Sequence, residues 1–356
     1  MRRFFVAGAV GLLVCIGAAT PACSLVEDPT PAGNCPRSPE RVAKVSELLV
    51  IGHRGAAAKE VENTIPSMQR AIADGANAVE IDLSMTKDGV IVLWHDWDPD
   101  DSIALGRQAD SEANQHAKPL TPAKGDALRR PVDELTLAEL RQNYGYLVDD
   151  RRAPVEIPTL DQFLAWAVAE PALAYVVFDI KIPADRSHLT GELFTKVNDA
   201  LALRKPSFKH VFLTPHDSVY EHAMPYVTDD ALTFDVDPGV VVIGGASCDE
   251  SSSDHAKRRG KGYASTVLPT GVEAEAWDEL QKLLSCDLTA RDESTPPVPT
   301  KVIVATVDDR EQLECLLDMG LDGIITNDPA YLHQVATERG RKPFDPRASI
   351  TSTRPR

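Results

Sequence analysis

The chain has 356 residues and a formal net charge of -17 at pH 7, with 54 acidic residues against 37 basic ones. A surface this acidic repels polyanions, which argues against binding to nucleic acid or to anionic membranes in general. The hydrophobic share of 43% supports a substantial core, and the length suits one catalytic domain with appendages, since an eight-stranded α/β barrel commonly takes about 250 residues.

The N-terminus has the pattern of an export signal. Two arginines precede an apolar run over residues 4–19, which is followed by the small residue Ala22. The run is shorter than a comfortable membrane span. We therefore expect residues 1–22 to be a signal peptide and the protein to be exported, to the extracellular space or the cell envelope. Cleavage after Ala22 would place Cys23 first, which suggests a lipoprotein attached to a membrane through a lipidated Cys23; ordinary secretion is the alternative.

The composition divides the rest of the chain into three segments. Residues 23–46 begin with a stretch rich in Pro, Ser, Thr and Gly, which is typical of a flexible tether. Residues 47–339 carry the strand and helix patterns of the catalytic domain. Residues 340–356 form a polar C-terminal tail.

Four cysteines remain beyond the expected signal peptide and Cys23, and an even number in an oxidising compartment favours disulfides. We expect Cys248 to pair with Cys286. Buried free thiols are the alternative, because cysteine behaves as a small apolar residue in protein cores.

The first third of the chain contains three ionisable clusters next to strand-like apolar runs. LLVIG leads to His53 and Arg54, and VIVLW leads to His95. Between these runs, Glu80 and Asp82 alternate with apolar residues, so their side chains share one face of a strand. Two carboxylates on one face indicate a cation site. Two histidines at strand ends can act as acid and base on either side of a substrate in a barrel enzyme.

Local signals place the next elements. Asn63 and Thr64 can cap a helix whose apolar residues recur at helical spacing as far as Asp74. Residues 87–89, Lys-Asp-Gly, favour a hairpin turn between strands over 78–84 and 90–94, which leaves no room for a crossover helix.

The polar segment from Trp97 to Arg130 is expected to be an insertion on the catalytic face. It opens with the acidic run DWDPDD, which we interpret as a solvated loop that partly covers the site. A second cation site is the alternative, although the run lacks the glycine and the distal glutamate of an EF-hand loop. Helices are predicted over 136–143 and 158–169.

The fourth strand, AYVVFDIKI, is apolar except for Asp179 and Lys181, which share one face. Buried charges of this kind need partners, and a metal and a phosphate group would provide them. The segment between Gly244 and Gly262 is expected to be a surface loop, with a basic patch near His255 that could alternatively bind a polar head group. The remaining predicted elements are strands over 210–215, 231–238, 301–307 and 323–328, a helix over 273–284 and a closing helix from Pro329.

Taken together, these motifs resemble the glycerophosphodiester phosphodiesterase family. The matching segments are HRG at 53–55, ENT at 62–64, ExD at 80–82, KDG at 87–89, HD at 95–96, FDIK at 178–181 and GLDGIITNDP at 320–329. The resemblance implies an α/β fold, a (β/α)8 TIM barrel with loop insertions on the catalytic face.

The resemblance also implies a single divalent cation, Ca2+ or Mg2+, bound by Glu80, Asp82 and Asp179, because hard oxygen ligands suit these ions. Most members of the family have Glu where this chain has Asp179. Glu62 and Asn63 are expected to support the site from beside the phosphate.

The expected chemistry is acid-base catalysis on a phosphodiester. Arg54 and Lys181 would hold the phosphate oxygens. One of His53 and His95 would remove a proton from the nucleophile, and the other would supply one to the leaving alcohol. The resemblance implies that the nucleophile can be the neighbouring hydroxyl of the substrate itself, which forms a cyclic phosphate that water then opens.

Three functions remain open at this point. The first is hydrolysis of a small-molecule glycerophosphodiester to sn-glycerol 3-phosphate and an alcohol. The second is a phosphodiesterase acting on lipid head groups, similar to sphingomyelinase D or lysophospholipase D. It is favoured by Asp179-Ile180-Lys181 and by Ala305, where the family often has Trp. The third is an inactive barrel that binds such ligands at the surface, which would be marked by loss of a histidine or a metal-binding acid, and this sequence has lost none.

Overall fold

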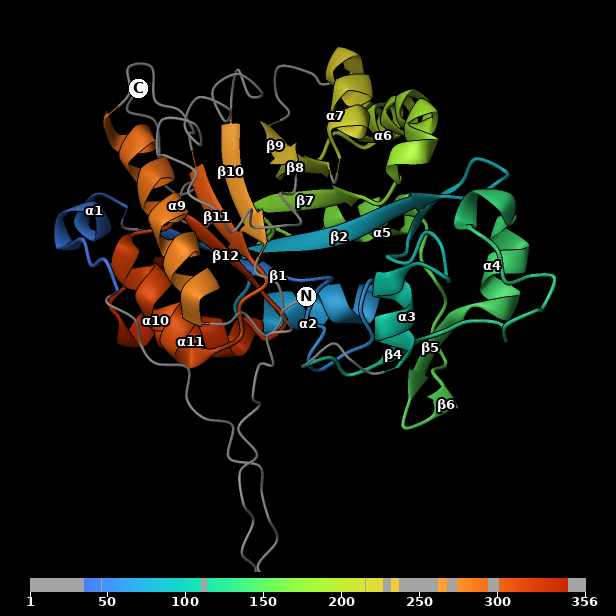
Figure 1. The fold of residues 1–356 in the computed structure, drawn as a ribbon, viewed down its shortest axis with the longest axis horizontal. Coiled ribbons are helices and arrows are strands. Elements are labelled where there is room, and N and C mark those ends of the chain that lie inside the picture. Colours follow the sequence, from blue (N-terminus) through green and yellow to red (C-terminus); the bar gives the residue numbers. More distant parts are fainter. Residues whose placement is uncertain are drawn as a thin grey trace, which may run out of the picture. The chain divides into compact units, whose positions relative to one another are not determined.

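The computed structural model describes residues 35–45, 47–109, 114–214, 216–226, 232–236, 262–267, 274–293 and 301–344. Within these residues, eight parallel strands form a closed barrel, because β1 pairs with β12 on one side and with β2 on the other. The fold is therefore the expected TIM barrel (Figure 1). Its strands are β1 (Glu47–Gly52), β2 (Ala78–Met85), β7 (Tyr175–Ile180), β8 (Lys209–Thr214), β9 (Leu232–Val236), β10 (Gly262–Val267), β11 (Lys301–Ala305) and β12 (Gly323–Thr326).

Three of the helices begin at threonine capping residues, of which Thr64 was predicted from the sequence. Thr64, Thr136 and Thr159 each accept a hydrogen bond from a backbone N–H in the first turn of the following helix. The α-helices are α1 (Pro39–Lys44), α2 (Ile65–Ala73), α3 (Ser102–Gln108), α4 (Leu137–Asn143), α5 (Leu160–Ala167), α6 (Thr190–Arg204), α7 (Asp217–Ala223), α9 (Ala274–Glu293), α10 (Arg310–Met319) and α11 (Pro329–Glu338). Short 3-10 turns cover Val132–Glu134, Ala184–Leu189 and Met224–Tyr226.

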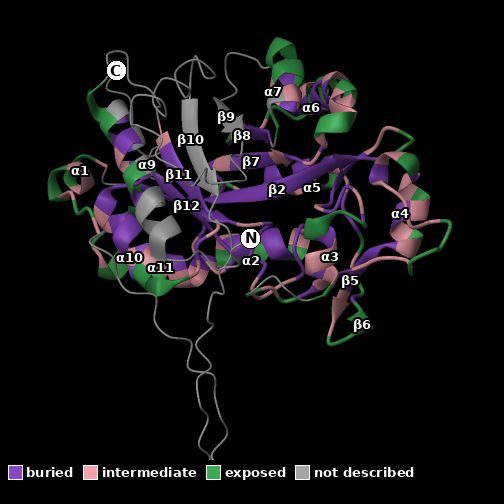
Figure 2. Cartoon of the chain, in the orientation of Figure 1, coloured by how far each residue is buried: buried purple, intermediate pink, exposed green. Residues whose placement is uncertain are grey.

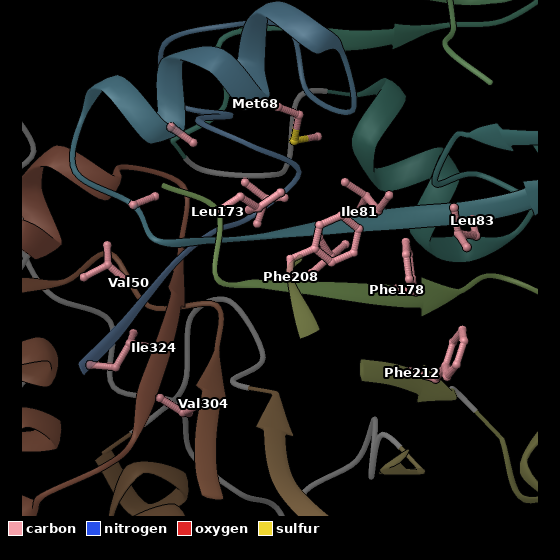
Figure 3. Packing of buried hydrophobic residues seen from close by; sticks show 14 of the residues in the cluster. Val50, Met68, Ile81, Leu83, Leu173, Phe178, Phe208, Phe212, Val304 and Ile324 are labelled. Atoms are coloured by element: carbon pink, nitrogen blue, oxygen red, sulfur yellow. The ribbon is translucent and has the colours of Figure 1, made fainter. Parts of the chain in front are cut away.

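Alternate residues of each barrel strand belong to two separate cores. In β1, Leu49 and Ile51 join the apolar cluster inside the barrel, whereas Leu48 and Val50 join the cluster between strands and helices. Figure 3 shows this outer cluster, with Met68 of α2 packed over β2. Every residue of β2 is consequently buried (Figure 2). A polar side chain on the inner face of a strand can therefore only face the barrel interior or its mouth.

One strand predicted to be in the barrel lies outside it, and one strand of the barrel was not predicted. The strand expected over 90–94 is β3 (Ile91–Leu93), which pairs antiparallel with β2 through the expected hairpin and lies outside the parallel barrel. The eighth barrel strand is instead β10, which lies between β9 and β11 and was not predicted from the sequence. The sequence of β10 is GYASTV, in which small and polar residues dilute the apolar signal.

The boundaries of the domain also need correction. The tether expected over residues 23–46 is wrong at its C-terminal end, because α1 is helical and Ser38 N–H donates to the carbonyl of Asp318. The tail expected from residue 340 is wrong at its start, because β13 (Lys342–Pro343) pairs with β1. Residues 1–34, which include the expected signal peptide and Cys23, lie outside the described residues.

One disulfide is present that the sequence did not predict, and the expected pairing of Cys248 with Cys286 stays a prediction. Cys35 is bonded to Cys315, which connects the segment before α1 to α10. Cys286 is also disulfide-bonded, and Cys248, its expected partner, lies outside the described residues together with the loop that contains His255. The alternative of buried free thiols is therefore wrong for Cys35, Cys286 and Cys315.

The segment expected to be an insertion is structured where it is described. After α3 it contributes β4 (Lys118–Leu120), which forms a separate three-stranded sheet with β5 (Gly145–Val148) and β6 (Arg151–Arg152). These strands lie beside α3 and α4 in Figure 1. In the acidic run, Asp101 caps α3 and Asp100 pairs with Arg129, as expected of a loop rather than a cation site.

No described helix has the length and apolar character needed to cross a membrane.

Candidate active site

The inner faces of neighbouring strands carry the candidate metal ligands. Ala78 belongs to the interior cluster, and the period-2 geometry of β2 places Glu80 and Asp82 on the same face farther along the strand. Asp179 of β7 stands directly opposite Asp82 in the pairing register. The expected set of three acids is therefore brought together by adjacent strands.

These three carboxylates form a group that could hold a metal ion. One ligand oxygen from each lies within 4.8 Å of the others. Oε1 of Glu80 is buried without a hydrogen-bond partner, as expected for an oxygen that can bind a metal ion. Burial and the charges of Asp82 and Asp179 raise the pKa of Glu80 well above its usual value. Burial likewise raises the pKa of Asp179. Three hard oxygens that repel one another fit a divalent cation such as Ca2+ or Mg2+.

Asp82 stays ionised despite its burial. Desolvation opposes the charged form, but Lys181 and Arg54 together lower the pKa of Asp82 below its usual value. Asn63 adds to this effect, since its Nδ2 donates to Asp82 Oδ2 at 2.6 Å and its Oδ1 accepts from the backbone N–H of Asp82 at 3.1 Å. Asn63 therefore orients Asp82, a candidate metal ligand.

Lys181 and Arg54, the two expected phosphate-binding cations, both lie against the carboxylate group. Lys181 Nζ is 2.6 Å from Asp179 Oδ2 and 3.0 Å from Asp82 Oδ1. Arg54 Nε is 3.0 Å from Asp82 Oδ2, and its Nη1 donates to Glu62 Oε2 at 2.7 Å. The Lys181 side chain is 16% exposed and that of Arg54 only 4%. Lys181 is therefore the more accessible of the two.

A strained turn after β1 presents Arg54 to the acids. Arg54 has a φ of 50° and Gly55 a φ of 92°. A Cβ atom on Gly55 would lie 2.4 Å from Ser67 Oγ and 2.6 Å from the carbonyl carbon of Ser67. This turn directs the backbone N–H of Arg54 to Glu80 Oε2 at 2.8 Å.

His53 is held by a neutral amide. Its Nδ1 is 2.8 Å from Asn327 Oδ1. The Asn327 amide is oriented in turn by Asp308, whose Oδ2 accepts from Asn327 Nδ2 at 2.7 Å. Because an amide oxygen only accepts hydrogen bonds, Nδ1 of His53 carries the proton and Nε2 bears the lone pair in the neutral ring. Nε2 is 3.9 Å from Glu80 Oε2, so the imidazole lies at the edge of the carboxylate group.

His95 reaches the site by a route that the sequence analysis misjudged. It does not follow a parallel strand. The hairpin returns antiparallel along β2, with Leu93 opposite Leu83, and the N–H of Trp94 donates to the Asp82 carbonyl at 3.2 Å. His95 therefore lies beside the middle of β2, next to the position of Asp82.

His95 is held by a carboxylate. Its Nδ1 is 2.6 Å from Asp96 Oδ1. Burial lowers the pKa of His95 well below its usual value, and the positive charges of Arg54, Lys181 and Arg107 lower it further. His95 is therefore neutral at pH 7, and its position near these cations places it beside the carboxylate group.

Glu62 and Asp96 are connected by Arg107 of α3. Arg107 Nη2 bonds to Glu62 Oε1, and its Nε lies 2.9 Å from Asp96 Oδ1. Burial raises the pKa of Asp96 to about 6, although the charge of Arg107 lowers it. Glu62 thus pairs with two arginines, and through Arg54 it is connected to Asp82.

Four residues of this network had no predicted role: Asp96, Arg107, Asp308 and Asn327. For two of them the sequence contains a pattern that indicates a place in the site. Asp96 adjoins His95, and Asn327 shares the inner face of β12 and its extension with Ile325. Arg107 and Asp308 had none, because each meets its partners only through tertiary folding.

Comparison with known proteins agrees with this geometry. The model of the glycerophosphoryl diester phosphodiesterase family matches residues 53–204, which include both histidines and all three acids. The protein YqiK of Bacillus subtilis is 24% identical over 284 residues, or 79% of this chain and 95% of YqiK. Glycerophosphodiester phosphodiesterase 1 of Homo sapiens is 34% identical over 96 residues, which is 27% of this chain but only 29% of the human protein.

Solved structures show the same fold. A glycerophosphoryl diester phosphodiesterase structure from Silicibacter pomeroyi superposes with a TM-score of 0.59 at 20% identity, covering 85% of this chain and 98% of that one. A phosphodiesterase structure from Oleispira antarctica, in complex with the product sn-glycerol-3-phosphate, superposes with a TM-score of 0.54 at 17% identity, covering 83% of this chain and 99% of that one. Residues 53–204 of the chain therefore match the glycerophosphoryl diester phosphodiesterase family, and the barrel has the fold of the solved structures named above.

Proposed function

We propose that this protein hydrolyses glycerophosphodiesters to sn-glycerol 3-phosphate and an alcohol, using a divalent cation and two histidines. One observation supports this most strongly. Three acids, two cations and two histidines from separate segments of the chain converge at one end of the barrel. The related structure that contains sn-glycerol-3-phosphate supports the choice of substrate class.

Glu80, Asp82 and Asp179 would hold one Ca2+ or Mg2+ ion. When bound, the ion would polarise a phosphoryl oxygen and neutralise negative charge that develops on it. The protein contributes the preorganisation: Asn63 fixes Asp82, and the Arg54 backbone fixes Glu80. Lys181 reaches the substrate phosphate more readily than Arg54, and Arg54 adds positive charge from a more buried position.

The two imidazoles carry out the proton transfers. Each is positioned through Nδ1, which leaves Nε2 for the substrate. One ring, in its neutral form, would accept the proton of the attacking hydroxyl at Nε2, and the other ring, in its imidazolium form, would donate its Nε2 proton to the oxygen of the departing alcohol. If the nucleophile is a hydroxyl of the substrate, the same two rings reverse their roles when water opens the cyclic phosphate.

The activity can be tested with purified protein and glycerophosphocholine. We expect release of sn-glycerol 3-phosphate and choline. His53→Ala and His95→Ala should each lower kcat by at least about 100-fold, the range that general acid-base groups supply, while substrate binding persists. Unchanged rates in both variants would contradict the assignment of the histidines.

A lipid substrate is the second candidate, because a lysophospholipase D of Mus musculus is 35% identical over 54 residues, or 15% of this chain and 16% of that protein. Sphingomyelin and lysophosphatidylcholine should therefore be assayed beside glycerophosphocholine. Choline release from the lipids alone, without glycerol phosphate, would replace the first proposal by the second.

The same proposal places the protein outside the cytoplasm. It is supported by the signal-like residues 1–22 and by the disulfide between Cys35 and Cys315, which fits an oxidising compartment. Membrane attachment would be through Cys23. Mass spectrometry of the mature N-terminus tests this, since a diacylated Cys23 would support attachment and an unmodified or uncleaved terminus would contradict it.

A further inference from the structure

Arg107 lies in the insertion rather than in any barrel strand. It is on α3, which begins where the Asp101 side chain accepts the backbone N–H of Ala104 at 2.7 Å. Helix α3 directs Arg107 inward, and the residue is only 3% exposed. Burying a guanidinium group costs free energy of folding unless anionic groups pair with it. The anions that pair with Arg107 therefore indicate its role.

Those partners are two carboxylates of the catalytic region. Arg107 bonds to Oε1 of Glu62, its Nη1 donates to Oε2 of the same residue at 3.3 Å, and its Nε lies 2.9 Å from Asp96 Oδ1. Asp96 in turn contacts His95, and Glu62 contacts Arg54. The result is a buried row of alternating charges from Arg54 through Glu62, Arg107 and Asp96 to His95.

We propose that Arg107 is a positioning residue for His95, acting by keeping Asp96 ionised and fixed against Nδ1 of the imidazole. Its contacts with Glu62 and Asp96 place it next to the carboxylate that holds His95. The inference rests on the proposed function for its effect on rate. Its structural part, the state of His95, can be tested without turnover.

The charges around Asp96 explain why this cation matters. Burial and the nearby anions Glu62 and Asp101 favour protonated Asp96, whereas Arg107 and, to a smaller extent, Arg54 favour the anion. The balance leaves the Asp96 pKa at about 6. A neutral residue at position 107 would remove the largest attractive charge, so the Asp96 pKa would rise. A protonated Asp96 no longer accepts as a carboxylate from His95 Nδ1.

The insertion offers a matched control. Arg129 is also buried, with 5% of its side chain exposed, and it pairs with Asp100 and donates to Pro99 and Pro122 carbonyls within the insertion. It contacts neither Glu62 nor Asp96. Arg129→Met should therefore weaken the insertion without changing the charge next to His95.

The first experiment compares Arg107→Met, Arg107→Lys and Arg129→Met by melting temperature and by the pH dependence of kcat on glycerophosphocholine. We expect Arg107→Met to lower kcat by about 10- to 100-fold, as loss of residues that orient a catalytic group typically does. The acidic limb of its profile should move to higher pH, and KM should change less than kcat. Arg107→Lys should restore part of the rate. Arg129→Met should lower the melting temperature and keep the wild-type profile.

The second experiment records the Nδ1 proton of His95 by NMR in the resting protein, assigned by its loss in His95→Gln. We expect Arg107→Met to weaken or abolish this signal at pH 7, and Arg129→Met to retain it. A wild-type signal and pH profile in Arg107→Met, or equal losses in Arg129→Met, would overturn the proposal. If the wild type does not hydrolyse glycerophosphocholine, the proposed function fails, and the NMR comparison still decides the role of Arg107.

Discussion

At the scale of single residues, the two histidines proposed as acid and base differ in the group that holds Nδ1. Asn327 presents a neutral amide oxygen to His53, and Asp96 presents a carboxylate to His95. A carboxylate stabilises an imidazolium as it forms, whereas an amide mainly fixes the tautomer and the orientation of the ring. The site therefore supports the two rings by different means.

Removing the amide should affect His53 specifically. We predict that Asn327→Ala lowers kcat by about 10- to 100-fold, because the ring loses its orienting acceptor. Steady-state kinetics with glycerophosphocholine would measure this. Asn77→Ala is the matched control, since Asn77 is also buried and its side chain bonds to backbone atoms of Val50, Leu48 and Phe344. The control should lose stability and keep its kcat; similar losses of kcat in both variants would show that the effect is not local to His53.

Single residues also show what the sequence could predict about the site. Strand periodicity was sufficient to place Glu80, Asp82 and Asp179 on inner faces, and their convergence is confirmed. Periodicity could equally have identified Asn327. Arg107 could not be found in this way, because it lies on α3 and its partner Glu62 is 45 positions away in the sequence.

At the scale of elements, the turn after β1 depends on a backbone shape that few residues adopt. We predict that Gly55→Ala destabilises the fold by about 1–3 kcal/mol, the usual cost of a strained backbone residue, and also lowers kcat because Arg54 moves relative to Glu80. Gly125→Ala is the matched control, as its φ is also positive, 89°, but no atom lies within 4 Å of an added Cβ. Chemical denaturation and kinetics would separate the two. Equal effects on both properties would contradict a special role for Gly55.

The elements that the sequence predicted well have strong local signals. The Lys-Asp-Gly turn, with Gly89 at a φ of 74°, predicted the hairpin, and the cap at Thr64 predicted the start of α2. Strand β10 lacked such a signal because its edges are defined by pairing with β9 and β11 rather than by its own residues. The hairpin turn implies that β3 runs antiparallel to β2. The position of His95 beside the middle of β2 follows from that direction.

The disulfide between Cys35 and Cys315 connects two elements outside the barrel, α10 and the segment before α1, neither of which contributes a residue to the site. We predict that the double variant Cys35→Ser, Cys315→Ser loses about 2–4 kcal/mol of unfolding free energy, because the unfolded chain is no longer cross-linked. Its kcat should match that of the wild type. Denaturation under non-reducing conditions measures the loss, and a double variant as stable as the wild type would refute the prediction.

At the scale of the whole molecule, a protein with a net charge of -17 places three of its carboxylates in one largely buried group. Without a cation, the raised pKa of Glu80 means that the folded state binds a proton more tightly than the unfolded state. This contribution to stability is present at low pH and is lost as the pH rises through the raised pKa. A cation competes with that proton, so it should bind more tightly at higher pH.

Thermal denaturation with and without Ca2+ or Mg2+ tests this coupling. We predict a larger rise in melting temperature at about pH 8 than at about pH 5, where the cation must displace a proton from Glu80. Glu80→Gln should show a smaller rise and less dependence on pH, because a neutral amide replaces the titrating ligand. An equal rise at both pH values in the wild type would contradict the prediction.

The central claim is that Glu80, Asp82 and Asp179 bind one divalent cation on which hydrolysis depends. The most direct measurement is the rate of sn-glycerol 3-phosphate release from glycerophosphocholine by chelator-treated protein, before and after Ca2+ or Mg2+ is added, in the wild type and in Asp179→Asn. We predict almost no release by the treated wild type, recovery with one of the two ions, and little recovery in Asp179→Asn at the same ion concentration. Full activity after chelation, or equal recovery in Asp179→Asn, would contradict the claim.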